Sequence, residues 1–400
     1  MLAEQAQAEV VHHWTQMLGG STQSFRAIVS DQDCPAITID GVETRMHVRA
    51  RPMPDFPNLV CEFATDAPVA RAEMGSLHFP LRPERADQII LVGDTGCRLK
   101  EGAPVHACND PVAWPYAKIA RAIAAKEADL AIHLGDYFYR EVPCPDPELC
   151  GEVFGDNWPT WEADFFVPSQ PMLNAHAFVF VRGNHESCER GWLGYLRFLA
   201  ADPVRAPLMC DNYQAPFVVE FEDLQLPVID SSTRDRETYT WDRLRAMRRQ
   251  FMDVLPTLDR ETLLLTHTPL WGYGSKKQNS TDMETLESIQ REAFAHILPR
   301  LVTAVIAGDL HFAQVVSTPG NPVQITFGNG GVWLYTTPEG QARDLPVGKG
   351  VMGDIFGYNP FGFGQIDRAQ GTFTLTFFDD SGAVAGACAA PVSVDSCALD

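Results

Sequence analysis

From residue 88 onward, short apolar runs alternate with amphipathic stretches along the chain. Such apolar runs are typical of buried strands, and they occur at 89–92, 130–134, 178–181, 217–221, 224–229, 263–266 and 304–307. Helical spacing of apolar residues occurs between many of them, at 112–126, 158–173, 191–200, 241–255 and 281–298. Strands that alternate with helices predict an α/β fold in which helices cover a layered sheet.

The chain before residue 84 has a different pattern. Apolar residues at Val10, Val11, Trp14, Met17 and Leu18, followed by a Gly-Gly pair, predict a helix within 1–18. Short β-type runs at 25–29, 44–48 and 59–63 predict either a small β-rich segment or an edge of the main sheet. We therefore expect an N-terminal helix and β-rich segment (1–83), a catalytic domain (84–380) and a C-terminal tail (381–400).

Beyond residue 307 the pattern becomes β-rich. Strands are expected at 313–317, 323–326 and 332–335 and within 362–378. The Gly/Pro-rich stretch 337–361 is expected to be a long surface excursion.

Side chains with oxygen or nitrogen donors directly follow five of the apolar runs. The carboxyl ends of strands in open α/β sheets converge on one crevice, and glycines let the backbone turn sharply there, so we expect these loops to meet. Each motif is weak alone, but together they carry enough donors for two metal ions. The loops are Gly93-Asp94-Thr95-Gly96, Gly135-Asp136-Tyr137-Phe138-Tyr139, Arg182-Gly183-Asn184-His185-Glu186, Thr266-His267 and Gly308-Asp309-Leu310-His311.

The charge of the chain narrows the class of partner. With 52 acidic and 31 basic side chains, the formal net charge is −21. Such a surface disfavours nucleic acid and anionic membranes as partners, and no apolar stretch reaches the roughly 20 residues of a membrane span. An anionic substrate therefore needs a local positive centre, which bound metal ions would supply.

Ten cysteines indicate an oxidising compartment. They fall into the local couples Cys34/Cys61, Cys97/Cys108, Cys144/Cys150, Cys188/Cys210 and Cys388/Cys397, and the last couple would tether the tail. The alternative is a set of buried free thiols. The first residues lack the basic and apolar segments of a signal peptide, so we expect a periplasmic or secreted protein whose leader is absent from this chain.

The order Gly-Asp-x-Gly, Gly-Asp-x-x-Tyr, Gly-Asn-His-Glu, x-x-x-His and Gly-x-x-His resembles the calcineurin-like metallophosphoesterase superfamily. The purple acid phosphatase branch is the most similar, on account of Tyr139 and the later glycine-rich turn Phe327-Gly328-Asn329-Gly330-Gly331. The resemblance implies an αββα sandwich with a two-metal centre at the sheet ends.

The resemblance also implies how the ligands divide between the two metal ions. Asp94, Tyr139 and His311 would hold Fe(III), Asp136 would bridge, and Asn184 and His267 would hold a second ion: Fe(II), Mn(II), Zn(II) or Mg(II). Asp309 stands where the family has a second-metal histidine, and its harder carboxylate favours Fe²⁺, Mn²⁺ or Mg²⁺ over Zn²⁺, or marks weak second-metal occupancy.

For the substrate side, the resemblance gives His185 as the group that contacts phosphate and protonates the leaving group, with Glu186 as its orienting neighbour. Lys276 and Lys277 take the place of a histidine pair of the plant-type members and are candidates to bind phosphate, or else form a solvated loop tip. Arg140 and Arg182 are further candidates, each with the alternative of pairing with a nearby acid. Tyr137, Trp271 and Tyr273 are candidates for an aromatic rim.

The sequence thus predicts a phosphomonoesterase that uses a hydroxide activated by two metal ions and acts on a small phosphate ester. A phosphodiesterase or nucleotidase on the same centre is the enzymatic alternative. A metal- or phosphate-binding protein with little catalysis is the alternative of another class. The oligomeric state is left open.

Overall fold

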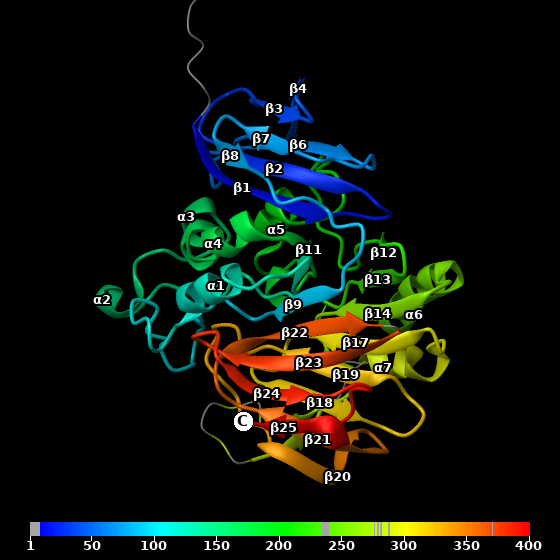
Figure 1. Cartoon of the computed structure of the whole chain (residues 1–400). Helices are drawn as coiled ribbons and strands as arrows, with labels where there is room; N and C mark the ends of the chain where they lie inside the picture. Colours follow the sequence, from blue (N-terminus) through cyan, green and yellow to red (C-terminus); the bar gives the residue numbers. More distant parts are fainter. Residues whose placement is uncertain are drawn as a thin grey trace, which may run out of the picture.

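Two β-sheets pack face to face, and helices cover their outer faces (Figure 1). The structure is a computed structural model and describes residues 9–233, 240–275, 277, 280, 282–286, 289–369 and 371–400. The layers follow the order helix, sheet, sheet, helix, which confirms the αββα sandwich. None of the described helices combines the length and apolar character that crossing a membrane requires.

The larger sheet has eleven strands and is parallel at its centre. In spatial order its strands are β25 (Cys397–Leu399), β24 (Val384–Cys388), β23 (Thr372–Asp379), β22 (Gly362–Ala369), β9 (Gln88–Val92), β10 (Leu130–His133), β11 (Ala177–Phe180), β1 (Val10–Met17), β2 (Gln23–Val29), β6 (Leu59–Thr65) and β5 (His47–Ala50).

The smaller sheet has eight strands, of which four neighbours run parallel. Its order is β12 (Phe217–Glu220), β13 (Leu224–Ile229), β14 (Glu261–Thr266), β17 (Val302–Ala307), β19 (Val323–Phe327), β18 (Ala313–Ser317), β21 (Val351–Tyr358) and β20 (Gly340–Gly348). Minor sheets join β3 (Ala36–Ile39), β4 (Val42–Arg45), β7 (Ala72–Met74) and β8 (Leu77–His78), and β15 (Tyr273–Gly274) with β16 (Glu284–Thr285).

Side chains alternate between two apolar cores along the central strands. Ile89 and Leu91 of β9 face the core between the sheets, whereas Ile90 and Val92 face the helices on the other side. That outer layer contains α1 (Tyr116–Ala124), α3 (Trp158–Trp161), a π-helical turn η1 (Glu162–Phe166), α4 (Val167–Ala175) and α5 (Trp192–Phe198), while α6 (Trp241–Val254) and α7 (Ile289–Phe294) cover the smaller sheet. The short helix α2 (Pro147–Cys150) lies in the loop after β10.

The predicted N-terminal helix is wrong, because the chain forms strand β1 where residues 10–17 are described. Trp14 packs into the helix-side core and Met17 into the core between the sheets. A strand that is buried on both faces has no period-two pattern, so its apolar spacing resembled that of a helix. The following strands β2, β5 and β6 extend the main sheet, which was one of the two interpretations of this segment.

Two expectations for the C-terminal third also need correction. Residues 332–335 form an irregular loop and not a strand, and the stretch 337–361 forms the β20–β21 hairpin of the smaller sheet and not a surface excursion. Glycines at the turn and inside β21 mask the β pattern there, although most of β21 is buried. The tail continues the larger sheet as edge strands β24 and β25.

All five expected cysteine couples are disulfides. Cys34–Cys61 and Cys388–Cys397 lie in the outer strands and segments of the larger sheet, whereas the other three lie in loops at the carboxyl ends of its central strands.

A buried charge cluster fixes the first strands to the rest of the molecule. Arg26 and Arg49 both pair with Glu62, at 2.9 and 3.2 Å, and both donate to the carbonyl of Ala200 just after α5. Because cations suit the carbonyl-rich end of a helix, the cluster connects the sheet edge to α5. Burial alone would raise the pKa of Glu62, but the two arginines lower it to about 2 from its usual value of 4.5.

Replacement of Glu62 by Gln should lower the free energy of unfolding by about 3–5 kcal/mol, because it leaves two buried guanidinium groups without a carboxylate. A carboxylate whose pKa is depressed on folding stabilises the protein fully above its unfolded pKa. In the wild type, the contribution of Glu62 to the free energy of unfolding should be lost as the pH falls from about 4.5 towards about 2. In Glu62→Gln the free energy of unfolding should lack this pH dependence. Denaturant unfolding at several pH values measures both effects.

Asp33→Asn is the matched control, because the ion pair of Asp33 with Arg45 is exposed. Its loss should change stability by less than about 1 kcal/mol. Equal effects of the two substitutions would contradict the role of the buried cluster.

Candidate metal centre

Five strands from the two sheets present polar side chains to one buried point. Strands β9, β10 and β11 of the larger sheet and β14 and β17 of the smaller sheet end there. All seven expected metal ligands are brought together and are at most 3% exposed: Asp94, Asp136, Tyr139, Asn184, His267, Asp309 and His311.

The backbone of this site is unusual at its three aspartates. Asp94, Asp136 and Asp309 adopt φ values of +57°, +61° and +65°, in the left-handed region that L-residues rarely occupy. Asp tolerates this region better than most residues, and the conformation turns each side chain at the strand end. Gly183 allows the close approach, because a Cβ there would meet Asp136 Oδ1 at 2.1 Å.

Tyr139 lies at the centre of the first group of donors. Its Oη is 2.9 Å from Asp94 Oδ1 and 2.8 Å from Asp136 Oδ2, and 3.4 Å from His311 Nε2. Four donor atoms from three loops therefore converge on one small volume.

His267 lies at the centre of a second group of donors, on the other side of Asp136 from Tyr139. Its Nε2 lies 3.2 Å from Asp136 Oδ2, 3.2 Å from the Asn184 side-chain amide and 3.9 Å from Asp309 Oδ1. Asp94, Asp136 and His267 offer atoms within 4.8 Å of one another, which is compatible with coordination of a metal ion. Asp309 lies on the His267 side, and its backbone N–H donates to Asp94 Oδ2 at 2.9 Å.

Backbone carbonyls orient both histidines of the expected ligand set. His267 Nδ1 lies 2.7 Å from the carbonyl of Leu134, and His311 Nδ1 lies 2.9 Å from that of Trp333. These bonds turn Nε2 of each ring to the centre, as in protein sites where the second nitrogen of a metal ligand is fixed by a neighbour.

The buried negative charges of the site favour the binding of cations. Burial, together with the carboxylates of Asp136 and Asp309, raises the pKa of Asp94 well above its usual value. Burial alone would lower the pKa of His267, but the carboxylates of Asp136, Asp94 and Asp309 raise this pKa to about 10. Burial, with the positive charge of Arg98, keeps the pKa of His311 low. A proton on His267 thus partly offsets three buried carboxylates, and oxygen and imidazole donors in this arrangement fit metal ions that would replace that proton.

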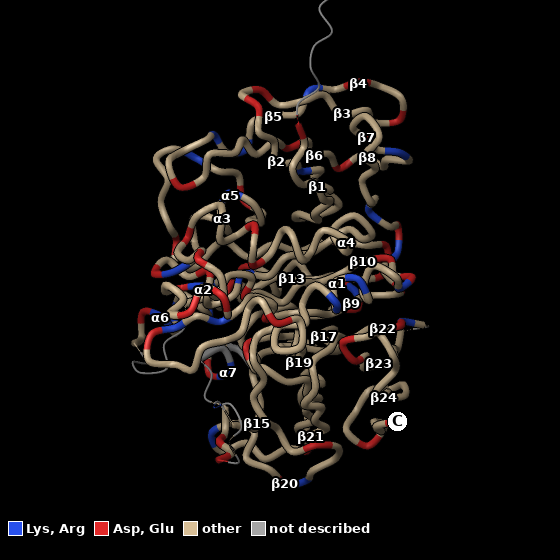
Figure 2. The backbone as a smooth tube through the Cα atoms, turned by 90° about the vertical axis from the view of Figure 1, so that its left-hand side faces the viewer, with Lys and Arg blue, Asp and Glu red and all other residues tan. Residues whose placement is uncertain are grey.

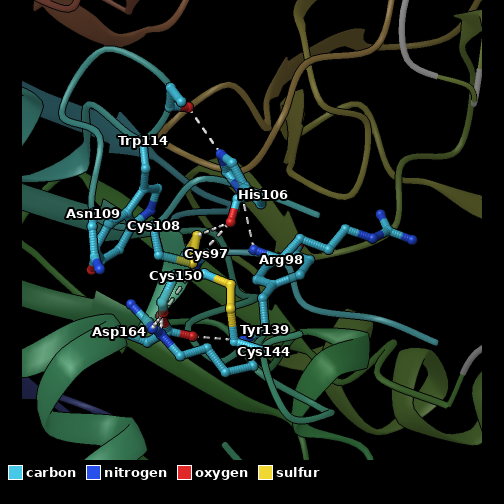
Figure 3. Close-up of a disulfide and its surroundings, with 12 residues drawn as sticks. Cys97, Arg98, His106, Cys108, Asn109, Trp114, Tyr139, Cys144, Cys150 and Asp164 are labelled. Carbon is cyan, nitrogen blue, oxygen red and sulfur yellow. Dashed lines mark hydrogen bonds and ion pairs between the residues drawn. A yellow bond between two sulfur atoms is a disulfide. The ribbon is translucent and has the colours of Figure 1, made fainter. Parts of the chain in front are cut away.

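Two buried carboxylates that are not ligands hold the loops in place. Glu186 accepts hydrogen bonds from the backbone N–H groups of Asp136, Tyr137, Phe138 and Gly183. Asp164, in the π-helical turn η1, accepts from those of Cys97 and Tyr139 at 3.3 and 3.0 Å (Figure 3). Burial and Asp136 raise the pKa of Glu186 to about 8.

Glu141, and not Glu186, orients His185. Glu141 Oε1 lies 2.7 Å from His185 Nδ1 and 3.3 Å from Arg190, whereas Glu186 faces the backbone of the Asp136 loop. The His185 ring lies against that of Tyr139, with 3.8 Å between their centres. Its Nε2 is 3.9 Å from Asp136 Oδ2, so it faces the centre.

The two arginines among the other substrate-binding candidates have acidic partners. Arg140 pairs with Asp164 at 2.6 Å and Arg182 with Asp230 at 3.0 Å, which is the alternative left open for both. Lys277 is exposed, and Lys276 lies outside the described residues.

The expected aromatic rim is wrong for Tyr137 and Trp271, which are at most 1% exposed. Instead, Trp333 and Tyr335 of the loop 332–335 lie beside the expected ligands, in one apolar cluster with Tyr139. The Tyr335 ring stacks on that of His311, with centres 4.1 Å apart. The glycine-rich turn before this loop pairs with the Asp94 loop, because the Gly330 N–H donates to the Gly93 carbonyl and that of Val332 to the Asp94 carbonyl.

Comparison with known proteins agrees with this geometry. The family model described as calcineurin-like phosphoesterase matches residues 87–313, which include every ligand named above. The chain belongs to the calcineurin-like phosphoesterase family. Family membership and fold make it a metallophosphoesterase, a hydrolase of phosphate esters. No curated protein sequence matches the chain.

Solved structures of this fold include two that cover most of the chain. A purple acid phosphatase, PPD1 from yellow lupin (Lupinus luteus) seeds, matches with a TM-score of 0.60 and 13% identity over 94% of this chain and 73% of its own. PhoD matches with a TM-score of 0.58 and 10% identity over 97% of this chain and 91% of its own. At these identities the likeness concerns the fold.

Metal-stripped protein should gain thermal stability when Mn²⁺ is added, because the ion relieves repulsion among the buried carboxylates. The gain should shrink as the pH falls, because the ion must displace the proton that His267 holds with a pKa of about 10.

Asp94→Asn should weaken metal binding by more than about 100-fold. The metal-free variant should unfold at the same or a higher temperature than the wild type, because one of three repelling carboxylates is gone.

Calorimetric unfolding with and without Mn²⁺ tests this, with the exposed Asp31→Asn as control. Undiminished metal affinity in Asp94→Asn would show that the ions bind elsewhere.

Proposed function

We propose that the protein is an extracytoplasmic phosphomonoesterase of the purple acid phosphatase type. Fe(III) would occupy the site of Asp94, Tyr139 and His311, and a divalent ion the site of Asn184, His267 and Asp309, with Asp136 shared between them. The five disulfides support the location.

The position of Tyr139 carries this proposal. A phenol whose oxygen lies within 2.9 Å of two carboxylates has a high pKa, through burial and the charges of Asp136 and Asp94. Only a strongly polarising ion makes its deprotonation favourable there, and a hard trivalent ion prefers an anionic oxygen. When bound, the two ions would polarise a phosphoryl oxygen and lower the pKa of a nearby water molecule.

His185 is the proposed acid for the leaving group. Glu141 holds Nδ1 of its ring, so Nε2 is left to face the substrate over the centre. Glu186 supports the reaction as a positioning residue, because four backbone N–H groups around Asp136 depend on its carboxylate.

The second metal site departs from the family in charge. Asp309, 3.9 Å from His267 Nε2, adds a carboxylate where the family has an imidazole. We expect this site to prefer Fe²⁺, Mn²⁺ or Mg²⁺ over Zn²⁺.

Metal-loaded protein should hydrolyse an aryl phosphate monoester with a higher kcat/KM than the corresponding bis-aryl diester. A preference for the diester would assign the centre to phosphodiesters. Binding of phosphate without turnover of either ester, from acid to mildly alkaline pH, would make the protein a phosphate-binding one.

His185→Asn is the matched variant in this assay. It keeps a polar side chain with a nitrogen donor but cannot act as an acid, so kcat should fall about 10²–10⁴-fold. The loss should be larger for an alkyl phosphate than for an activated aryl phosphate, because a good leaving group needs less protonation.

The iron assignment predicts a colour. Protein purified with its native metals should contain iron and show a broad visible absorption band from tyrosinate bound to Fe(III). Tyr139→Phe should lose the band, and elemental analysis shows whether iron is retained. The buried Tyr137→Phe is the control, because the hydroxyl of Tyr137 bonds to the carbonyl of Val181 and not to a ligand. A colourless, iron-free wild type would leave the phosphoesterase fold intact but contradict the purple-phosphatase assignment.

A further inference from the structure

Arg98 lies beside the first group of expected ligands, and its charge lowers the pKa of His311, but no role in substrate binding has been assigned to it so far. Its Nη1 donates to the Tyr335 hydroxyl at 3.1 Å, and its guanidinium group lies over the Trp333 ring at 5.3 Å from the ring centre. Tyr335 in turn stacks on His311 with the two rings almost parallel, at 8°. Arg98 is therefore separated from a metal ligand by one aromatic ring.

The backbone at Arg98 is held firmly. Cys97, which precedes it, is buried and bonded to Cys108, and the Arg98 N–H donates to His106 Nδ1 at 3.1 Å. The next residue, Leu99, donates to the carbonyl of Tyr139 at 3.0 Å. In Figure 3 the Arg98 side chain extends away from the Cys97–Cys108 disulfide. A charge fixed in this way is preorganised for binding.

Among the described residues, no carboxylate neutralises Arg98. Arg140, Arg182 and Arg190, which flank the ligand loops, pair with Asp164, Asp230 and Glu141. No carboxylate of the described residues lies within ion-pair distance of Arg98. In a chain of net charge −21, with acidic positions scattered over the backbone (Figure 2), an arginine without a described carboxylate partner is a candidate binding group for an external anion.

We propose that Arg98 determines substrate specificity: it binds an anionic oxygen of the substrate that the metal ions leave unbound. The inference rests on the proposed phosphoesterase activity. Guanidinium binds phosphate and carboxylate oxygens through charge-assisted hydrogen bonds. The oxygen is either the third terminal oxygen of a phosphomonoester or an oxygen of a second anionic group on the leaving group.

Either oxygen would distinguish a phosphomonoester, or a substrate with a second anionic group, from a simple diester. In a diester the third terminal oxygen carries a carbon substituent and has lost its charge, so Arg98 gains nothing from it. Trp333 is only 7% exposed and fixes one face of the guanidinium group, which limits how far Arg98 can swing to another partner. The site is thus expected to favour substrates that carry more negative charge than a diester and that place this charge on the side of Tyr139 and His311.

The test compares wild type and Arg98→Gln, both loaded with metal, on an aryl phosphate monoester, a bis-aryl diester and a nucleoside 5′-diphosphate. Arg98→Gln should lower kcat/KM about tenfold or more for the monoester, for the diphosphate or for both. For the diester, kcat/KM of the variant should stay within about twofold of the wild-type value. The affinity for inorganic phosphate, measured by calorimetry, gives a readout that does not depend on turnover.

The three substrates separate the two sources. A fall for the monoester together with weaker phosphate binding assigns Arg98 to the third terminal oxygen. A fall for the diphosphate alone, with unchanged phosphate binding, assigns it to the leaving group. Equal changes for all three substrates, or none, would overturn the proposal, whereas a wild type inactive on every ester would instead contradict the proposed function.

Two further variants guard against a structural effect. Arg98→Lys keeps the charge but not the fork of donors, so its defect should be smaller than that of Arg98→Gln. Arg343→Gln removes an exposed arginine paired with Asp354 on the β20–β21 hairpin and should change nothing. Metal content and the midpoint of thermal unfolding of Arg98→Gln should match the wild type.

Discussion

The mutual repulsion of three buried carboxylates is the constraint on which the structure depends. Asp94, Asp136 and Asp309 meet where water is excluded, so their charges are poorly screened. These carboxylates also raise the pKa of His267 to about 10, so a proton on that ring offsets part of the repulsion. Such a site persists without metal only if the surrounding fold over-determines it, and each of the three aspartates is held in the left-handed region.

The loops, more than the sheets, supply that over-determination. Glu186 and Asp164 accept six backbone hydrogen bonds from the ligand loops and from Gly183, and Arg140 compensates the charge of Asp164. Disulfides close the same loops at Cys97–Cys108, Cys144–Cys150 and Cys188–Cys210. The two sheets deliver the strand ends to one place, and these polar and covalent links then fix the individual donors.

Much of this arrangement could be predicted from the sequence, because the ligands follow apolar strands directly and the cysteine couples are close in sequence. The rest depends on contacts between distant segments. Strand β1 has no recognisable period because neighbours bury both of its faces, and glycines obscure the β20–β21 hairpin. Glu141 lies 44 residues from His185, and Tyr335 lies 237 residues from Arg98. No local pattern distinguishes such residues from solvated ones, so the sequence points to Glu186 instead of Glu141 and to Tyr137 and Trp271 as two of the three rim residues.

The carboxylate of Asp309 and the guanidinium group of Arg98 bear on each other through charge. Asp309 in place of a histidine makes the loaded centre one unit more negative than that of a family member with the same ions. That change weakens the attraction of the centre for a phosphate dianion, in a protein whose surface already repels anions. Arg98, which is one aromatic ring away from His311 and has no carboxylate partner among the described residues, would restore a positive charge near this site.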